Sequence, residues 1–514
     1  MASRRRGRDR GETKARRAAT GFRQAPRGQL TNTLPSIEIL SSDQIEAIHD
    51  TSLTILEEIG INFLLDEARE ILAAAGARVQ AGDPRVRLDR GLVMEAMASV
   101  PAEFTLHARN PENHRRIGGR HFTISLVSSP PNATDIENGR RQGNFEDYCN
   151  FLRLGQILNI VDFVAGYPVE PTDIPPPIRH LKAEQALATL TDKALYGYAL
   201  GGQRMRDSIE LARIARGRTN EELDRETSIW SVVNANSPLQ YDRPMLRGVM
   251  ELAKRNQAVV FTPFTLAGAM APVTIAGALA QQNAEALAGI AFAQLVRPGA
   301  PVVYGGFTSN VDMKSGAPAF GTPEYVKAAL AGGQLARRYR VPYRSSNVNA
   351  SNAPDAQAVY ESQMSIWACF LGGCNVMKHG LGWLEGGLSA SFEKVIIDAE
   401  MLQMMAEVMR PIEVDEANLG LDAIREVGPG GHFFGAAQTL ERYETAFYAP
   451  FLSDWRNYES WSEDGAKSAT RRAHEIYQRL LADYEPPPMA PEIAEELDAF
   501  VARRIEDGGA IPED

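Results

Sequence analysis

Short apolar runs alternate with longer stretches of helical periodicity through the middle of the chain. Three of the runs, residues 301–307, 341–349 and 374–383, begin with apolar residues and end in polar, glycine-containing sequence. Between them, residues 323–339 and 355–372 carry small and apolar residues at helical spacing. Strand, polar turn and helix in that order are typical of an α/β fold whose functional groups follow the strands.

The same alternation extends toward the N-terminus. From residue 145 onward there are strand candidates that end at Tyr167, Leu200, Val233, Phe261, Tyr304, Tyr343 and Met377. Seven strands separated by helices favour a TIM-type (β/α)8 barrel, although an eighth strand is not assigned. Residues 121–126 also read as a strand, but they precede a turn-rich segment at 128–135 that we take as the start of the barrel body. An open doubly wound sheet has the same local pattern and is the alternative.

The sequence on either side of this body has a different character. We expect a disordered basic tail at residues 1–30, an N-terminal helical and β extension at 31–135, the α/β barrel body at 136–410 and an aromatic-rich, helical C-terminal extension at 411–514. The N-terminal extension should open with a helix after Ser41, because serine is a favoured N-cap and apolar residues follow it at helical spacing.

Composition indicates a globular protein with an ample core. Of the 514 residues, 44% are hydrophobic and 23% are charged. No apolar run approaches the roughly 20 residues of a membrane span. Three cysteines without a CxxC spacing form no disulfide framework, so we expect a reducing, cytoplasmic location.

Charge separates the tail from the rest of the chain. The net charge of -11 argues against a nucleic-acid surface on the folded body. Residues 1–27 oppose that balance, because they hold ten Arg or Lys residues and only two acidic ones, Asp9 and Glu12. This segment has too little apolar surface to offset the entropy of ordering the chain, so we expect it to be a solvated tail.

The common catalytic motifs are missing from the sequence. There is no HExxH, Walker loop, G-x-S-x-G or GxGxxG after a strand. The eight histidines are scattered, so the sequence predicts no metal site. His379 and Glu385 follow the predicted strand at 374–383, where an α/β barrel carries its active groups, and they are candidate catalytic residues.

Several glycine-rich motifs occur in a fixed order along the chain. They are Val-Val-Tyr-Gly-Gly-Phe at 302–307, the segment 312–321, Pro-Asp-Ala-Gln-Ala at 354–358, His-Gly-Leu-Gly-Trp-Leu-Glu-Gly-Gly at 379–387 and Gly-Pro-Gly-Gly-His at 428–432, with Leu-Thr-Asp-Lys at 190–193. Through these motifs, residues 35–503 resemble the trimethylamine methyltransferase family, which comprises corrinoid-dependent methylamine methyltransferases and relatives without pyrrolysine. The resemblance implies a barrel fold and methyl transfer to a corrinoid.

One loop departs from the founding members of that family. In the founding trimethylamine enzymes a pyrrolysine lies in a loop that corresponds to residues 345–352, which here read Ser-Ser-Asn-Val-Asn-Ala-Ser-Asn. Relatives without pyrrolysine resemble demethylases of glycine betaine, proline betaine and carnitine. The resemblance therefore implies a quaternary amine, rather than trimethylamine, as the methyl donor. Within this loop, Asn347 and Asn349 join the candidate catalytic residues.

A quaternary amine leaves as a neutral amine, so its demethylation needs no proton and depends on positioning. Aromatic faces attract a desolvated quaternary ammonium group by ~2 kcal/mol each. A zwitterionic donor also needs a partner for its carboxylate, and Arg344, His379 or His432 would suit. The candidate substrate-binding residues are Phe264, Phe307, Tyr343, Arg344, Trp383 and His432, with ordinary core packing as the alternative for each aromatic residue.

The chain has no Asp-x-His-x-x-Gly segment of the kind that holds a corrinoid. We therefore expect no tightly bound cofactor, and we expect the corrinoid (cobalamin) to arrive on a cognate corrinoid protein. The other expected partners are a small quaternary amine and further copies of the chain in a homo-oligomer, without nucleic acid or membrane. Two alternatives remain: a methyltransferase that uses a sulfonium, thioether or methyltetrahydrofolate donor, and a non-catalytic betaine-binding barrel.

Overall fold

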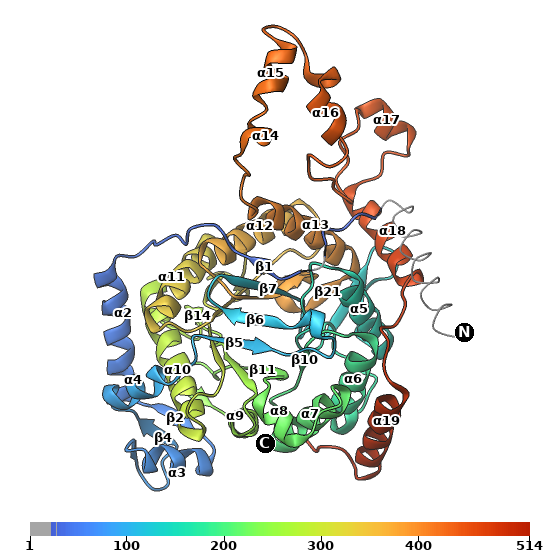
Figure 1. The fold of residues 1–514 in the computed structure, drawn as a ribbon. Helices are drawn as coiled ribbons and strands as arrows, with labels where there is room; N and C mark the ends of the chain where they lie inside the picture. Colours follow the sequence, from blue (N-terminus) through green and yellow to red (C-terminus); the bar gives the residue numbers. More distant parts are fainter. Residues whose placement is uncertain (1–21, 27, 514) are drawn as a thin grey trace.

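A strongly curled sheet forms the centre of the molecule (Figure 1). The computed structural model describes residues 22–26 and 28–513, so most of the predicted basic tail lies outside the described residues. The parallel part of the sheet has the order β10-β11-β13-β15-β18-β19-β7. Its strands are β7 (His121–Leu126), β10 (Leu195–Tyr196), β11 (Ile229–Val233), β13 (Ala258–Phe261), β15 (Val302–Gly305), β18 (Tyr343–Ser346) and β19 (Val376–Leu381). The predicted α/β fold class is confirmed.

Strand β7 belongs to the sheet although its residues precede the expected start of the body. It pairs in parallel with β19, at the far edge from β10. Isolated parallel bridges then join Ser125 to Phe163 and Phe163 to Ala194, between β7 and β10. The strand expected at 161–167 is thus a single bridged residue, and the strand missing from the count lies in the N-terminal extension.

Helices surround the curled sheet on its outer side (Figure 1). They are α5 (Phe145–Ile157), α6 (Pro176–Leu190), α7 (Gly202–Ala215), α8 (Asn220–Arg225), α9 (Arg243–Lys254), α10 (Ile275–Val296), α11 (Pro323–Tyr339), α12 (Ala356–Leu371) and α13 (Phe392–Val408). Polar side chains cap several of them by accepting a backbone N–H in the first turn, as at Asn144, Asp242, Thr274, Thr322, Asp355 and Ser391. These caps explain why the predicted helix boundaries agree closely with the structure.

An antiparallel hairpin covers the amino-terminal end of the sheet interior. It consists of β5 (Glu103–Leu106) and β6 (Arg115–Gly118), which pairs with β7, while β1 (Leu30–Thr31) pairs with β7 separately. Side chains of the hairpin and of the sheet surround a small apolar cavity there. They are Phe104, Leu106, Ile117, Phe163, Trp230, Ala258, Val260, Val303 and Val376. The interior of the sheet is therefore apolar at its amino-terminal end.

The N-terminal extension packs against the outer face of α10. Its helices are α2 (Ser42–Thr54), the π-helical turn η1 (Ile55–Ile59), α3 (Asp66–Ala74) and α4 (Arg90–Ala98). The predicted cap at Ser41 is confirmed as part of a capping box with Gln44. A small sheet of order β12-β2-β4-β3 joins the extension to the body through β12 (Gln240–Tyr241), β2 (Ile61–Phe63), β4 (Arg85–Arg87) and β3 (Arg78–Val79).

Two small sheets follow the carboxyl ends of the parallel strands. One contains β14 (Leu266–Ala267), β16 (Ser309–Val311) and β17 (Pro318–Ala319), and the other contains β8 (Asn132–Asp135), β9 (Gly139–Gln142), β20 (Trp383–Leu384) and β21 (Ser389–Ser391). The short helix η3 (Glu385–Gly387) connects β20 to β21. Because these elements follow the strand ends, they hold the polar segments that the sequence singled out.

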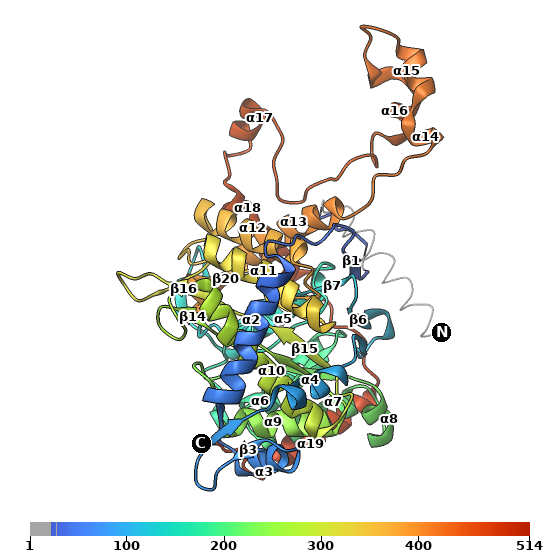
Figure 2. The same cartoon turned by 90° about the vertical axis from the view of Figure 1, so that its left-hand side faces the viewer.

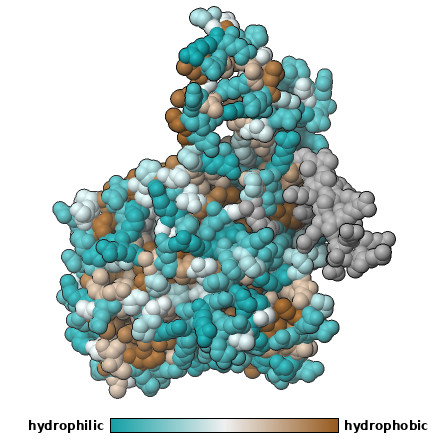
Figure 3. Space-filling model, viewed as in Figure 1, coloured by the Kyte–Doolittle hydropathy of each residue, from teal (hydrophilic) through white to brown (hydrophobic). Residues whose placement is uncertain are grey.

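The C-terminal extension divides into packed and projecting parts. Helices α18 (Ala469–Ala482) and α19 (Pro491–Glu506) pack on α13 and on α6 and α7, respectively. Between α13 and α18, the short helices α14 (Glu416–Leu419), α15 (Leu421–Val427), α16 (Ala437–Arg442) and α17 (Tyr458–Glu463) project from the body (Figures 1 and 2). This projecting segment exposes apolar side chains (Figure 3), including Ile412, Val414, Phe434, Phe447, Trp455 and Tyr458. None of the described helices meets the length and hydropathy of a membrane span.

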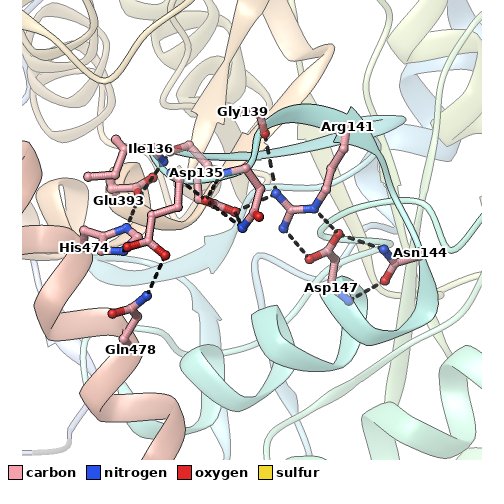
Figure 4. Close-up of polar contacts among 12 residues, drawn as sticks. Asp135, Ile136, Gly139, Arg141, Asn144, Asp147, Glu393, His474 and Gln478 are labelled. Atoms are coloured by element: carbon pink, nitrogen blue, oxygen red, sulfur yellow. Dashed lines mark hydrogen bonds and ion pairs between the residues drawn. The ribbon is translucent and has the colours of Figure 1, made fainter.

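A charged network ties the β8–β9 hairpin to the helices beneath it (Figure 4). Arg141 donates to Asp135 at 2.6 Å and to Asp147 at 2.7 Å. Both carboxylates are nearly buried, with side-chain exposures of 2% and 8%. In the same region, His474 of α18 lies 2.7 Å from the buried Glu393 of α13. The C-terminal helix α18 is therefore joined to the body by polar contacts as well as by packing.

We expect Arg141→Met to lower the free energy of unfolding by about 3 kcal/mol, because it leaves two buried carboxylates without a counter-charge. Urea denaturation measures this loss. Arg140→Met is the matched control: Arg140 pairs with Glu385 but is half exposed, so its loss should be about 1 kcal/mol or less. Equal losses in the two variants would show that Asp135 and Asp147 do not depend on Arg141.

Candidate functional site

Four aromatic side chains meet beyond the carboxyl ends of β13, β15 and β19. We call Phe264, Phe307, Phe320 and Trp383 the aromatic cluster. The ring centroid of Phe307 lies 5.3 Å from those of Phe264 and Phe320 and 6.1 Å from that of Trp383. Three of the four were candidates from the sequence. Phe320 was missed, although it lies within the motif at 312–321, because its distance from a strand end gave no reason to choose it.

Reciprocal contacts hold Trp383 in the cluster. Its indole Nε1 donates to the backbone carbonyl of Asn349 at 3.1 Å, and the Asn349 side-chain Nδ2 donates to the backbone carbonyl of Trp383 at 2.7 Å. Gly387, at φ +98°, lies so close to the indole ring that an added Cβ would come within 2.6 Å of it. The loops after β18 and β19 are therefore locked together around Trp383.

Asn347, two residues before Asn349 in the same loop, also connects this loop to β19. Its Nδ2 donates to the backbone carbonyl of Gly380 at 2.9 Å. Asn347 and Asn349 are both fully buried, and the side-chain Oδ1 of each has no hydrogen-bond partner among the described residues. A buried acceptor without a partner is uncommon in a folded protein. The loop at 345–352 thus supports the site and retains two acceptors without a partner among the described residues.

His379 lies against the aromatic cluster in an unusual backbone conformation. Its φ is +56°, a left-handed value that few non-glycine residues adopt. The ring centroid lies 4.4 Å from that of Trp383, and Nδ1 accepts a hydrogen bond from the backbone N–H of Ser128 at 3.2 Å. The proton of the neutral ring is therefore on Nε2. Burial, together with the charges of Lys378 and Arg344, holds the pKa of His379 well below its usual value.

Arg344 is a buried cation beside the same cluster. Its guanidinium carbon lies 5.3 Å from the ring centroid of Phe307, and Nη1 donates to the backbone carbonyl of Gly306 at 3.4 Å. Burial lowers the pKa of the guanidinium. Among the residues that the structure describes, no carboxylate forms an ion pair with it. Aromatic surface and an unpaired positive charge therefore lie side by side.

Glu385 lies at the rim and has partners of its own. Its carboxylate accepts from Arg140 at 2.8 Å and from the Ser389 hydroxyl at 2.5 Å. Burial acts to raise the pKa of Glu385, but these hydrogen bonds outweigh it and keep the pKa below the usual value. At neutral pH Glu385 is therefore an ionised group that ties η3 to β9.

Two other candidates from the sequence lie outside the cluster. The Tyr343 hydroxyl donates to the backbone carbonyl of Ala329 in α11, so its side chain faces the helix layer. Successive side chains of a strand point to opposite faces, and Arg344 occupies the interior face. His432 is exposed on the projecting segment between α15 and α16, with its ring near Phe434.

Metal ligands do not gather at this site or elsewhere in the described part of the chain. Within residues 22–26 and 28–513, no three His, Cys, Asp or Glu side chains come together as a possible metal site. The side chains that the structure brings together here are aromatic rings, amides, a neutral imidazole and the buried Arg344 guanidinium.

Comparison with known proteins places this arrangement in a family. Residues 4–509 match the model of the family described as "Trimethylamine methyltransferase (MTTB)". The chain belongs to the trimethylamine methyltransferase family. Glycine betaine methyltransferase of Desulfitobacterium hafniense (strain Y51) is 39% identical over 94% of this chain and 99% of its own.

Two further relatives show the breadth of this similarity. The trimethylamine methyltransferase MttB of Desulfitobacterium hafniense (strain DSM 10664 / DCB-2) is 29% identical over 91% of this chain and 94% of its own. Proline betaine:corrinoid methyltransferase of Eubacterium limosum is 28% identical over 78% of this chain and 84% of its own. The resemblance found in the glycine-rich motifs is therefore confirmed at the level of the family.

We expect the imidazole of His379 to stay neutral between about pH 8 and pH 6, where an ordinary histidine takes up a proton. The physical reason is its burial beside two cationic side chains. NMR of ring-labelled histidine, with the signal assigned by its loss in His379→Gln, measures the titration. A midpoint near pH 6.5 would contradict this expectation.

Proposed function

We propose that this chain transfers a methyl group from a quaternary amine of the betaine type to the cobalt(I) of a separate corrinoid protein. Family membership supports the reaction class, and the printed names of two relatives, a glycine betaine and a proline betaine:corrinoid methyltransferase, support the donor and the acceptor. The observation that carries the proposal is the aromatic cluster beside the unpaired, buried Arg344. In the reaction the C–N bond breaks, its electron pair stays on nitrogen, and the corrinoid accepts the methyl group.

The aromatic cluster suits the ammonium end of such a donor. A quaternary ammonium group has no N–H, so aromatic faces and not hydrogen bonds bind it, with ~2 kcal/mol from each desolvated contact. His379 lies against the cluster as a neutral ring and therefore adds no repulsion. Holding the donor in one orientation is the main contribution that the enzyme makes, because the leaving amine needs no proton.

Arg344 distinguishes a zwitterion from a simple cation. Two unit positive charges about 5 Å apart repel by ~3 kcal/mol at an effective dielectric constant near 20. A trimethylammonium ion in the cluster would meet that repulsion from Arg344, whereas the carboxylate of a betaine pairs with the guanidinium. The charge at Arg344 therefore supports a betaine-type donor over trimethylamine.

The four candidate catalytic residues take different parts in this proposal. His379 contacts the donor from its position beside Trp383. Asn349 and Asn347 are positioning residues, because they hold the loops around Trp383 and Gly380. Glu385 is a positioning residue at the rim, where it fixes η3 against β9.

In our proposal the sheet closes into a TIM-type (β/α)8 barrel, in which the single residue Phe163 takes the place of one strand. The two bridges on either side of Phe163 support this closure.

The acceptor must reach the donor methyl from the carboxyl-terminal mouth, where the β16–β17 hairpin and η3 lie. Exposed Met313 in that hairpin offers apolar contact, and we place the docking site of the corrinoid protein there.

The projecting segment supports the proposal that the chain forms a homo-oligomer. Its exposed apolar residues are numerous, with Phe434 at 85% and Phe447 at 87% exposure. Large apolar patches on a protein surface mark interaction sites. Contact with a second copy of the chain would cover this surface.

The direct test is a methyl-transfer assay with free cob(I)alamin and a panel of donors. We expect turnover with at least one betaine and none detectable with trimethylamine. A sulfonium compound, a thioether and methyltetrahydrofolate in the same panel address the alternative donors. Trimethylamine turnover equal to that of every quaternary amine would contradict the donor class, and binding of betaines without any transfer would favour a non-catalytic barrel.

The same assay tests the residues. We expect His379→Ala and Glu385→Ala each to lower turnover at least tenfold, or ~1.4 kcal/mol at the barrier, with circular dichroism unchanged. The matched control is His121→Ala, at the amino-terminal start of β7 and far along that strand from the mouth. Wild-type turnover in folded His379→Ala and Glu385→Ala would reduce both residues to structural roles.

A further inference from the structure

The sheet interior changes from apolar to positively charged between its two ends. Partners in register on adjacent parallel strands point to the same face. Val376 lines the apolar cavity, and its partner in register is Arg344. The next pair on the same face is Ser346 and Lys378. Lys378, which was not among the candidate residues, therefore points inward one layer above the apolar residues.

Lys378 and Arg344 are both buried, and neither has an acidic partner among the described residues. The Lys378 Nζ lies 5.2 Å from the ring centroid of Tyr196, across the sheet interior on β10. Arg344 lies over Phe307. Burial, with the nearby charge of Arg344, holds the pKa of Lys378 well below its usual value. Two buried cations without a counter-charge are unfavourable in the folded protein unless something else neutralises them.

The other fully buried lysines of the described chain have such compensation. Lys394 forms an ion pair with Asp398, one turn along α13. Lys193 donates to three backbone carbonyls, those of Gly155, Leu158 and Val161. The missing partner of Lys378 is therefore a feature of this one position and not of how the fold treats buried lysines.

Polar atoms around the two cations also lack partners. The Thr262 Oγ1, the Arg344 Nε and the Ser346 Oγ are buried without a hydrogen bond to any residue that the structure describes. Gly305 lies between them: an added Cβ there would come within 2.5 Å of the Thr262 hydroxyl and 3.3 Å of the Arg344 Cδ. The glycine thus keeps these groups facing one another with no side chain in between.

We propose that Lys378, Arg344, Thr262 and Ser346 form an anion cradle that binds the carboxylate of the methyl donor. This inference rests on the proposed function and adds Lys378 as a specificity-determining residue. The carboxylate would lie inside the barrel. Phe307 contacts Arg344 on one side and belongs to the aromatic cluster, so it lies between the cradle and the rest of the cluster. The donor is then oriented with its anionic end inward and its methyl groups toward the mouth.

Binding should change the protonation of Lys378. The charged groups and titratable rings that face it are Arg344 on β18, His379 on β19 and Tyr196 on β10. None of them supplies a negative charge at neutral pH, so an incoming carboxylate is the group that favours the ammonium form. We therefore expect proton uptake on donor binding, seen by calorimetry in buffers of different ionisation enthalpy.

Lys378→Met tests the cradle through three readouts, which are ligand affinity, melting temperature and proton uptake. The variant should bind glycine betaine at least tenfold more weakly, while its affinity for choline, which has the same ammonium group and no carboxylate, should change less than twofold. Its melting temperature should rise, because a buried basic group without a partner is removed. Proton uptake should disappear. Lys182→Met, in α6 on the outer layer, is the matched control and should leave all three unchanged.

Thr262→Val keeps the volume of the site and removes one hydroxyl, and it should weaken glycine betaine binding threefold or more with choline binding unchanged. Unaltered glycine betaine affinity in both Lys378→Met and Thr262→Val, with methyl transfer retained, would overturn the cradle and leave the proposed function standing. Equal weakening of glycine betaine and choline would also overturn it. Failure of the wild-type protein to transfer a methyl group from any quaternary amine would instead overturn the proposed function.

Discussion

A pair of buried basic side chains without acidic partners is the constraint on which the rest of the site depends. Arg344 and Lys378 are buried on neighbouring strands without acidic partners among the described residues. Burying basic groups in this way destabilises a folded protein. Its persistence is understandable if the ligand brings the missing negative charge. The aromatic cluster directly beyond these cations would then bind the positive end of the same molecule.

The fold places these two regions in the right order. The β5–β6 hairpin and the sheet place apolar side chains around the cavity at the amino-terminal end of the sheet interior. The loops after β18 and β19 hold Trp383 at the other end through the reciprocal contacts with Asn349. A ligand bound between the two ends would contact polar groups of the protein deep in the sheet interior and aromatic faces near the mouth. That polarity suits a donor whose methyl group must meet an acceptor on another protein.

Local patterns predicted most of the elements because they depend on local physical chemistry. Capping residues such as Ser41 and Asp355 set helix starts, and β-branched runs set strands such as β11 and β13. The role of β7 was missed because its partner, β19, lies some 250 positions later, as in the pair Thr123 and Val376. No local pattern reports a pairing over that distance.

Site residues divide in the same way. Phe264, Phe307 and Trp383 were chosen because aromatic residues at strand ends stand out in the sequence, and the structure brings their rings together. Tyr343 was expected beside them, but the alternation of β18 turns it toward α11. Lys378 was overlooked because a lysine next to His379 is unremarkable in sequence. Only the register of β18 and β19 shows that it points inward, and only the three-dimensional structure shows that it lacks a partner.

A crystal structure of the protein with glycine betaine tests the central claim most directly. The account predicts that the carboxylate contacts Lys378 and Arg344 while the trimethylammonium group lies against Phe307 and Trp383, with a methyl group toward the mouth. A molecule bound in the reverse orientation, or bound outside the sheet interior with Lys378 and Arg344 left unpaired, would contradict it.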